Sequence, residues 1–223
     1  MSETIAIIGG TGPEGRGLAT RLALAGHTVI IGSRDAERGA KIAADLKASL
    51  PARDGAGDLR GGGNAGACAE ATLAIVTVPY AAHAGTLEAL REPLSDKLVI
   101  DAVVPVRFER GPRPVDVAAG SATEEAASLL PASTVVGAFH NLDAETLLDP
   151  DASLDADVLI TGSAEGKQRT AALAEQIAGV RAVDAGPLRY SRFVEGLTIL
   201  LIGINGRHRA HTGIRIAGLH QGE

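Results

Sequence analysis

The fold is decided near the start of the chain by residues 5–15, which read IAIIGGTGPEG. A short apolar run leads into a Gly10-x-Gly12-x-x-Gly15 turn, and a helical pattern follows. A strand, a glycine turn and a helix in this order form the pyrophosphate-binding unit of dinucleotide sites. Gly10 is expected to permit a tight bend, Gly12 to let the backbone approach the pyrophosphate, and Gly15 to let the helix pack closely on the strand. The alternative is a glycine turn with a purely structural role.

The composition excludes several classes of protein. The 223 residues have a formal net charge of −6, which argues against nucleic acid as a partner. The single cysteine, Cys68, forms no intrachain disulfide and makes a thiolate zinc cluster implausible, and no histidine pair has the spacing of metal ligands. The apolar runs are too short for a signal peptide or a membrane span. We therefore expect a cytoplasmic protein with no metal site and no membrane partner.

Strands and helices alternate along most of the chain. Strands are predicted at 4–9, 28–31, 73–78, 98–101, 135–139 and 158–161, and helices at 14–25, 36–50, 65–71, 82–90, 123–130 and 167–177, with room for a short strand in the Gly-rich stretch 51–63. This alternation predicts an α/β fold with a Rossmann-type doubly wound parallel sheet.

The pattern changes at the carboxyl end of the chain. From residue 188 it becomes helical, with an apolar helix at 193–205. We expect a dinucleotide-binding domain over residues 1–187 and a small C-terminal helical part over 188–223 that covers the substrate cleft. Because the apolar helix needs cover on more than one side, we also expect a homodimer.

The end of the second predicted strand indicates which dinucleotide binds. NAD enzymes usually place a carboxylate there, which would repel a 2′-phosphate, whereas this chain has Ser33 followed by Arg34. Arg34 can bind the phosphate as a fork or stack on adenine, and Arg38 adds a second cation one helical turn later. NADP is therefore favoured, although Asp35 adjoins Arg34 and the arginines could instead form a solvated helix start. The cofactor-binding residues predicted so far are Gly10, Thr11, Gly12, Pro13, Glu14, Gly15, Ser33, Arg34 and Arg38.

Further motifs lie across the whole chain. They are Gly9-Gly10-Thr11-Gly12, Gly32-Ser33-Arg34, Thr77-Val78-Pro79, Val104-Pro105, His140 within Ala138–Leu142, and Asp184-Ala185-Gly186-Pro187-Leu188-x-x-Ser191-Arg192-x-Val194-Glu195-x-Leu197-Thr198. With these motifs the chain resembles the NADPH-dependent F420 reductases over residues 5–216. The stretch from Asp184 to Thr198 is the most specific part of the resemblance.

The resemblance implies hydride transfer between the nicotinamide of NADP and the deazaflavin ring of coenzyme F420. Such a transfer needs no protein nucleophile, acid, base or metal, because the protein supplies alignment and a dry cavity. In the family the two rings stack between the nucleotide domain and the C-terminal helical part. The resemblance adds Thr77, Val78, Pro79 and Val103 to the cofactor-binding residues.

The resemblance also implies a set of deazaflavin contacts. His140 would hydrogen-bond the carbonyl region of the ring, Leu142 would press on its face, and Arg192 and Thr198 would line its polar edge. Gly196 stands where the family tends to carry a serine, so a hydroxyl contact is lost and space is opened.

Three of these residues have a structural alternative. His140 follows an apolar strand and could be a satisfied structural histidine. Thr198 lies on an apolar helix and could bond a backbone carbonyl, and Arg192 could pair with Glu195 at the i,i+3 spacing.

Two other functions stay open at this stage. One is an NADPH-dependent reductase of another acceptor, such as a flavin, a pterin or a quinone, in the space opened by Gly196. The other is a noncatalytic Rossmann protein that senses NADPH. Arg192, Thr198 and His140 argue against a sensor, because a sensor has no need for a second ring site.

Overall fold

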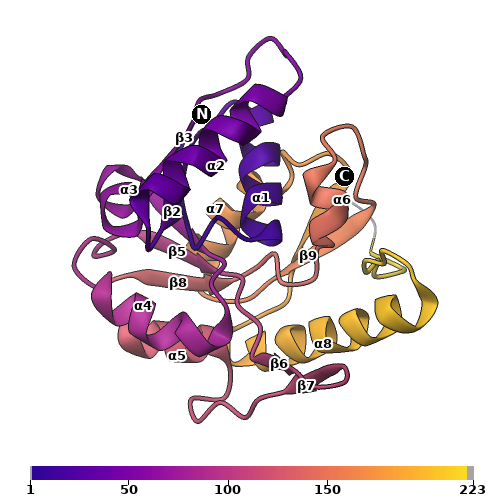
Figure 1. The fold of residues 1–223 in the computed structure, drawn as a ribbon. Coiled ribbons are helices and arrows are strands. Elements are labelled where there is room, and N and C mark those ends of the chain that lie inside the picture. Colours follow the sequence, from indigo (N-terminus) through magenta and orange to yellow (C-terminus); the bar gives the residue numbers. More distant parts are fainter. Residues whose placement is uncertain (1, 220–223) are drawn as a thin grey trace.

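The computed structural model describes residues 2–219 and is built around a six-stranded sheet (Figure 1). Its strands are β1 (Thr4–Ile8), β2 (Thr28–Ser33), β3 (Leu59–Gly63), β4 (Leu73–Val76), β5 (Leu98–Asp101) and β8 (Thr134–Gly137). They lie in the order β3-β2-β1-β4-β5-β8, and every neighbouring pair is parallel. The predicted parallel sheet is confirmed, and the Gly-rich stretch does hold a strand, β3.

Helices cover both faces of this sheet. They are α1 (Pro13–Leu24), α2 (Ala36–Ser49), α3 (Asn64–Glu70), α4 (His83–Ala89), α5 (Ala122–Leu129), α6 (Ala144–Leu148) and α7 (Ala164–Ala174). Alternate residues of β1 point to opposite faces, so Ile5 and Ile7 join the core under α1 and α7, while Ile8 joins the core under α3, α4 and α5. The sheet is therefore buried on both sides, as a doubly wound fold requires.

The strand predicted at 158–161 does not continue the main sheet. It belongs to β9 (Ala156–Ile160), which pairs in parallel with β10 (Val180–Asp184) as a separate two-stranded sheet. A single antiparallel bridge, Gly137 to Thr161, links this pair to β8. The chain reverses direction relative to the main sheet after β8, so the parallel order stops there.

The segment after β5 forms a hairpin that the sequence pattern did not predict. Its strands are β6 (Val106–Phe108) and β7 (Pro112–Pro114), and Arg110 and Gly111 adopt positive φ at the bend. The hairpin packs against the last helix, α8 (Ser191–His208), which is longer at both ends than the predicted helix. The hairpin and α8 lie next to each other at the bottom of the view in Figure 1.

The segment after α8 is tied to the β9 end of the fold. Asp157 is fully buried, and its carboxylate accepts hydrogen bonds from Arg181 (2.6 and 2.7 Å), from Arg215 (3.1 Å) and from the Ile216 backbone N–H (2.6 Å). The Asp157 N–H donates to the Ile214 carbonyl at 2.7 Å. The chain after α8 is thereby held along β9 as far as Ile216.

The predicted C-terminal part and the expected lack of a membrane span can be compared with the described residues only. The predicted C-terminal part runs to residue 223, of which residues 220–223 lie outside the described ones, and the division at residue 187 stays a prediction. Within residues 2–219, no helix is long and apolar enough to cross a membrane.

Candidate functional site

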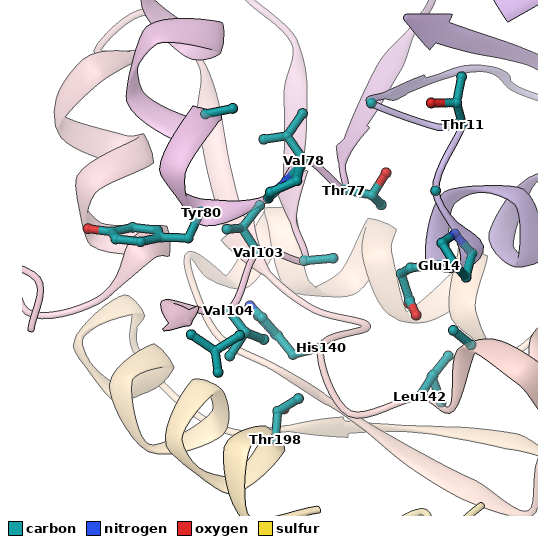
Figure 2. Close-up of a pocket in the computed structure, with 18 of the residues that line it drawn as sticks. Thr11, Glu14, Thr77, Val78, Tyr80, Val103, Val104, His140, Leu142 and Thr198 are labelled. Carbon is teal, nitrogen blue, oxygen red and sulfur yellow. The ribbon is translucent and has the colours of Figure 1, made fainter. Parts of the chain in front are cut away.

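A cavity of about 1250 Å³ opens where the carboxyl ends of β1, β2, β4 and β5 meet. The strand order reverses between β1 and β4, and open α/β sheets bind their ligands in the crevice at such a switch point. Predicted residues that line it are Thr11, Gly12, Pro13, Glu14, Ser33, Arg34, Arg38, Thr77, Val78, Pro79, Val103, His140, Leu142 and Thr198. One cavity thus joins the predicted dinucleotide turn to most of the predicted deazaflavin contacts (Figure 2).

The tight bend of the glycine turn lies at Gly9 rather than at Gly10. Gly9 has φ +71°, and a Cβ there would lie 2.5 Å from Val78 Cγ1. Gly10 has no positive φ, but a Cβ on it would meet the Ile7 carbonyl oxygen at 2.8 Å. The bend therefore needs the conformational freedom of one glycine and the small size of the next.

The two following glycines have different spatial demands. Gly12 is the N-cap of α1 in an extended conformation, and a Cβ on it would have nothing within 4 Å. A Cβ on Gly15 would lie 2.5 Å from Gly10 Cα and 2.8 Å from Thr77 Oγ1. Gly15 thus lets α1 pack against the turn, while Gly12 faces open space at a helix N-terminus, where a phosphate would bind.

The end of β2 carries the predicted 2′-phosphate site. Arg34 and Arg38 are exposed, line the cavity, and form no ion pair with another of residues 2–219. Asp35 does not pair with them, because its Oδ1 accepts from the backbone N–H groups of Glu37 (3.0 Å) and Arg38 (3.1 Å) at the start of α2. The carboxylate is engaged as a helix cap, which leaves the two guanidinium groups available to an anion.

At the other end of the cavity lies His140, which is only 5% exposed. Neither ring nitrogen has a hydrogen-bond partner among residues 2–219, and burial lowers the pKa of the imidazole to about 4. A neutral ring has one donor and one acceptor nitrogen, and buried polar groups are normally paired. The alternative of a satisfied structural histidine therefore finds no partner for the ring among the described residues.

Thr198 and Leu142 lie near His140 (Figure 2). The Thr198 hydroxyl donates to the Val194 carbonyl at 3.1 Å, so the backbone bond considered as its alternative role is present. Its oxygen still has lone pairs that can accept from a ligand. Thr198 therefore fits both readings.

Arg192 and Gly196 are not brought to this cavity. Arg192 pairs with Glu124 at 3.2 Å, and the predicted pairing with Glu195 does not form. Gly196 lines a separate hollow of about 790 Å³ between α8 and the β6–β7 hairpin. Both residues lie on the side of α8 away from Thr198, so the structure does not support their predicted deazaflavin contacts.

Sequence reasoning missed a buried polar network beside the cavity. His83 is fully buried, with Nε2 3.1 Å from Asp101 Oδ2 and Nδ1 2.9 Å from Glu125 Oε2. Burial opposes the imidazolium, but these two carboxylates outweigh it and raise the His83 pKa to about 9. Asp101 Oδ1 also accepts from the N–H of the cavity residue Val103 at 3.3 Å. No spacing in the sequence distinguishes these residues from ordinary helix and strand ends.

Glu195 was also missed as part of this region. Its carboxylate is buried and accepts from the N–H groups of Ala122 (2.9 Å) and Thr123 (3.0 Å) at the start of α5. Burial raises its pKa to about 7, although these bonds oppose the rise. Glu195 therefore links α8, which carries Thr198, to the sheet-bearing part of the protein.

A family model, curated relatives of at least 40% identity and a solved structure that are similar to this chain share one description. Residues 4–105 match the family model of the coenzyme F420-dependent NADP oxidoreductases. The F420-dependent NADP reductase of Methanothermobacter marburgensis is 44% identical over 96% of this chain and 98% of its own length, and that of Methanocaldococcus jannaschii is 40% identical over the same shares. The crystal structure of a putative F420-dependent NADP reductase from Arthrobacter sp. FB24 superposes with a TM-score of 0.80 at 27% identity, covering 97% of this chain and 100% of that one.

Proposed function

The chain belongs to the family of F420-dependent NADP reductases, and from that membership we propose the site of its reaction, a hydride transfer between NADP(H) and coenzyme F420. The observation that carries this proposal is the single cavity that runs from the glycine turn to His140 and Thr198. When bound there, NADPH supplies the hydride and the deazaflavin ring accepts it.

The residues at the β1 and β2 end fit NADP. The N-terminus of α1 presents N–H groups beside Gly12, where no protein atom fills the space next to the Cα. A pyrophosphate would receive these N–H bonds together with the favourable end of the helix dipole. Arg34 and Arg38 would bind the 2′-phosphate with charge-assisted hydrogen bonds.

The residues at the other end fit a flat ring with polar edges. His140 can donate and accept, and it has no protein partner within residues 2–219. Leu142 and Val103 present apolar surface on the walls of the same cavity. These residues would hold two rings in contact and exclude water, so that the hydride moves over a short distance.

The test is to mix the purified protein with NADPH and oxidised F420 and to follow the absorbance of the deazaflavin. We expect bleaching of the F420 band with stoichiometric oxidation of NADPH. If F420 stays oxidised while FMN or FAD is reduced, the protein is a reductase of another acceptor. If NADPH binds and no acceptor is reduced, the sensor reading holds. A His140→Ala variant, which keeps the whole dinucleotide end, is the matched control.

We further propose that the protein is a homodimer. Phe193, Leu200 and Ile204 of α8 are 67%, 64% and 39% exposed, and they lie on the helix face opposite Thr198. An apolar helix face of this kind favours contact with a second copy. Sedimentation of the protein and of Leu200→Glu tests this, because the charged variant should shift toward the monomer.

A cytoplasmic location is also proposed. It is supported by Cys68, which is buried as a free thiol with no disulfide, as is usual in a reducing compartment. Burial raises the pKa of this thiol to about 11, so it is unreactive. Fractionation of the host cells would test the location.

A further inference from the structure

We propose that Glu14 is a specificity-determining residue for the oxidation state of the nicotinamide, because its carboxyl group favours NADP⁺ over NADPH when it is ionised. This inference rests on the proposed function, since it requires NADP(H) in the cavity. It concerns the side chain of Glu14, whereas the glycine turn binds through its backbone.

Glu14 lies between the two ends of the cavity. It is in the first turn of α1, lines the cavity, and has a buried Oε1 with no hydrogen-bond partner in the described part of the chain. Figure 2 shows its carboxyl group on the same side of the cavity as Leu142, facing the space that His140 borders. With the 2′-phosphate at Arg34 and the pyrophosphate at Gly12, the nicotinamide would occupy this remaining arm of the cavity.

The surroundings of Glu14 disfavour its negative charge. Burial and the nearby carboxylate of Asp143 raise the pKa of Glu14 to about 8. Asp143 precedes α6, and its carboxylate is 3.2 Å from His211 of the chain after α8. His140 is neutral, and Arg16, on the same helix, forms no ion pair with Glu14 within residues 2–219. Glu14 therefore holds a proton at neutral pH, and its Oε1 has no hydrogen-bond partner within residues 2–219.

The two forms of the cofactor differ in the charge of one ring. The nicotinamide of NADP⁺ is a cation, whereas that of NADPH is neutral, and the phosphates are the same in both. A cation near a buried carboxyl group favours its ionised form. Binding of NADP⁺ should therefore release the Glu14 proton and be stabilised by the resulting carboxylate. NADPH should leave the proton in place.

The test measures dissociation constants for NADP⁺ and NADPH by calorimetry at a series of pH values from about 6.5 to about 9, which span the free-protein pKa. The quantity of interest is the ratio Kd(NADPH)/Kd(NADP⁺), in which titration of the shared phosphates cancels. We expect this ratio to rise about tenfold or more with pH, because a nearby opposite charge lowers a carboxyl pKa by about 1–3 units.

Two variants test the assignment to Glu14. In Glu14→Gln, which keeps the shape without the charge, the ratio should be the same at all these pH values. In Asp143→Asn, which keeps a good helix cap, the rise should persist with its midpoint at lower pH, because a like charge has been removed.

Three results would overturn the inference. They are a pH-independent ratio in the unchanged protein, a pH-dependent ratio that survives in Glu14→Gln, and a midpoint that Asp143→Asn does not move. If neither nucleotide binds the unchanged protein, the proposed function fails as well, so the two failures are distinguishable.

Discussion

Substitution by alanine should affect the two glycines at the start of α1 differently, lowering stability at Gly15 and NADPH affinity at Gly12. A Cβ on Gly15 would lie 2.5 Å from Gly10 Cα, whereas a Cβ on Gly12 would touch nothing within 4 Å. Carbon atoms in normal contact are about 3.5–4.0 Å apart, so in Gly15→Ala the helix must move away from the turn by about 1 Å. Gly12→Ala needs no such movement.

The distances set the expected sizes of the two effects. Overpacking costs about 1–3 kcal/mol, and the upper part of this range applies because the clash is with the backbone of Gly10. The better helix propensity of Ala offsets about 1 kcal/mol, so Gly15→Ala should lose about 1–2 kcal/mol of unfolding free energy. In Gly12→Ala, a poorer N-cap costs about 0.5–1 kcal/mol while the stiffer unfolded chain contributes about 0.4–1 kcal/mol, so the stability should stay nearly unchanged. The methyl group would nevertheless occupy the space of the pyrophosphate, and we expect NADPH affinity to fall about tenfold or more, or ~1.4 kcal/mol.

Urea denaturation and NADPH fluorescence titration measure the two quantities separately. We expect Gly12→Ala to be as stable as the unchanged protein and weak in binding, and Gly15→Ala to be less stable. A Gly12→Ala variant with undiminished NADPH affinity would refute the placement of the pyrophosphate. A Gly15→Ala variant as stable as the unchanged protein would refute the packing argument for the turn.

Three other substitutions have definite expected outcomes. Arg34→Ala should raise KM for NADPH far more than for NADH, because a lost charge-assisted bond is worth about 1.5–3 kcal/mol; equal effects in steady-state kinetics would exclude the 2′-phosphate role. His140→Phe should raise the midpoint of thermal unfolding, because each buried unpaired nitrogen costs about 1–3 kcal/mol, and it should weaken F420 binding in a titration. A lower midpoint would mean that His140 has a structural partner. Hydrogen bonds from Arg181 lower the pKa of Asp157 to about 2, so its carboxylate should stabilise the fold fully above about pH 4 and lose that contribution as the pH falls toward 2. Asp157→Asn should therefore be less stable than the unchanged protein at pH 7, and the difference in unfolding free energy should shrink in acid; a difference independent of pH would contradict this.

Local patterns were sufficient wherever a strand was long, apolar and followed by a glycine or a helix cap. Residues 5–15 predicted β1, the turn and α1, and the buried run at 73–78 predicted β4. The hairpin was missed because β6 and β7 have three residues each and β7 begins and ends with proline. β10 was missed because it is only partly buried and its five residues, VRAVD, do not alternate regularly between apolar and polar.

The sequence by itself determined the dinucleotide turn, the Ser33-Arg34 end of β2 and the alternation of strands and helices typical of a doubly wound sheet, because each depends on residues close together in the chain. Only the tertiary structure decided which face of α8 meets the cavity. That helix carries apolar residues all round, such as Phe193, Val194 and Ile199, so its pattern has no unique buried side. Packing on α5, with the Glu195 carboxylate at the α5 N-terminus, turns Thr198 inward and leaves Arg192 and Gly196 outside. The charge state of Glu14 was decided in the same way, because burial and Asp143, distant in the sequence, together raise its pKa.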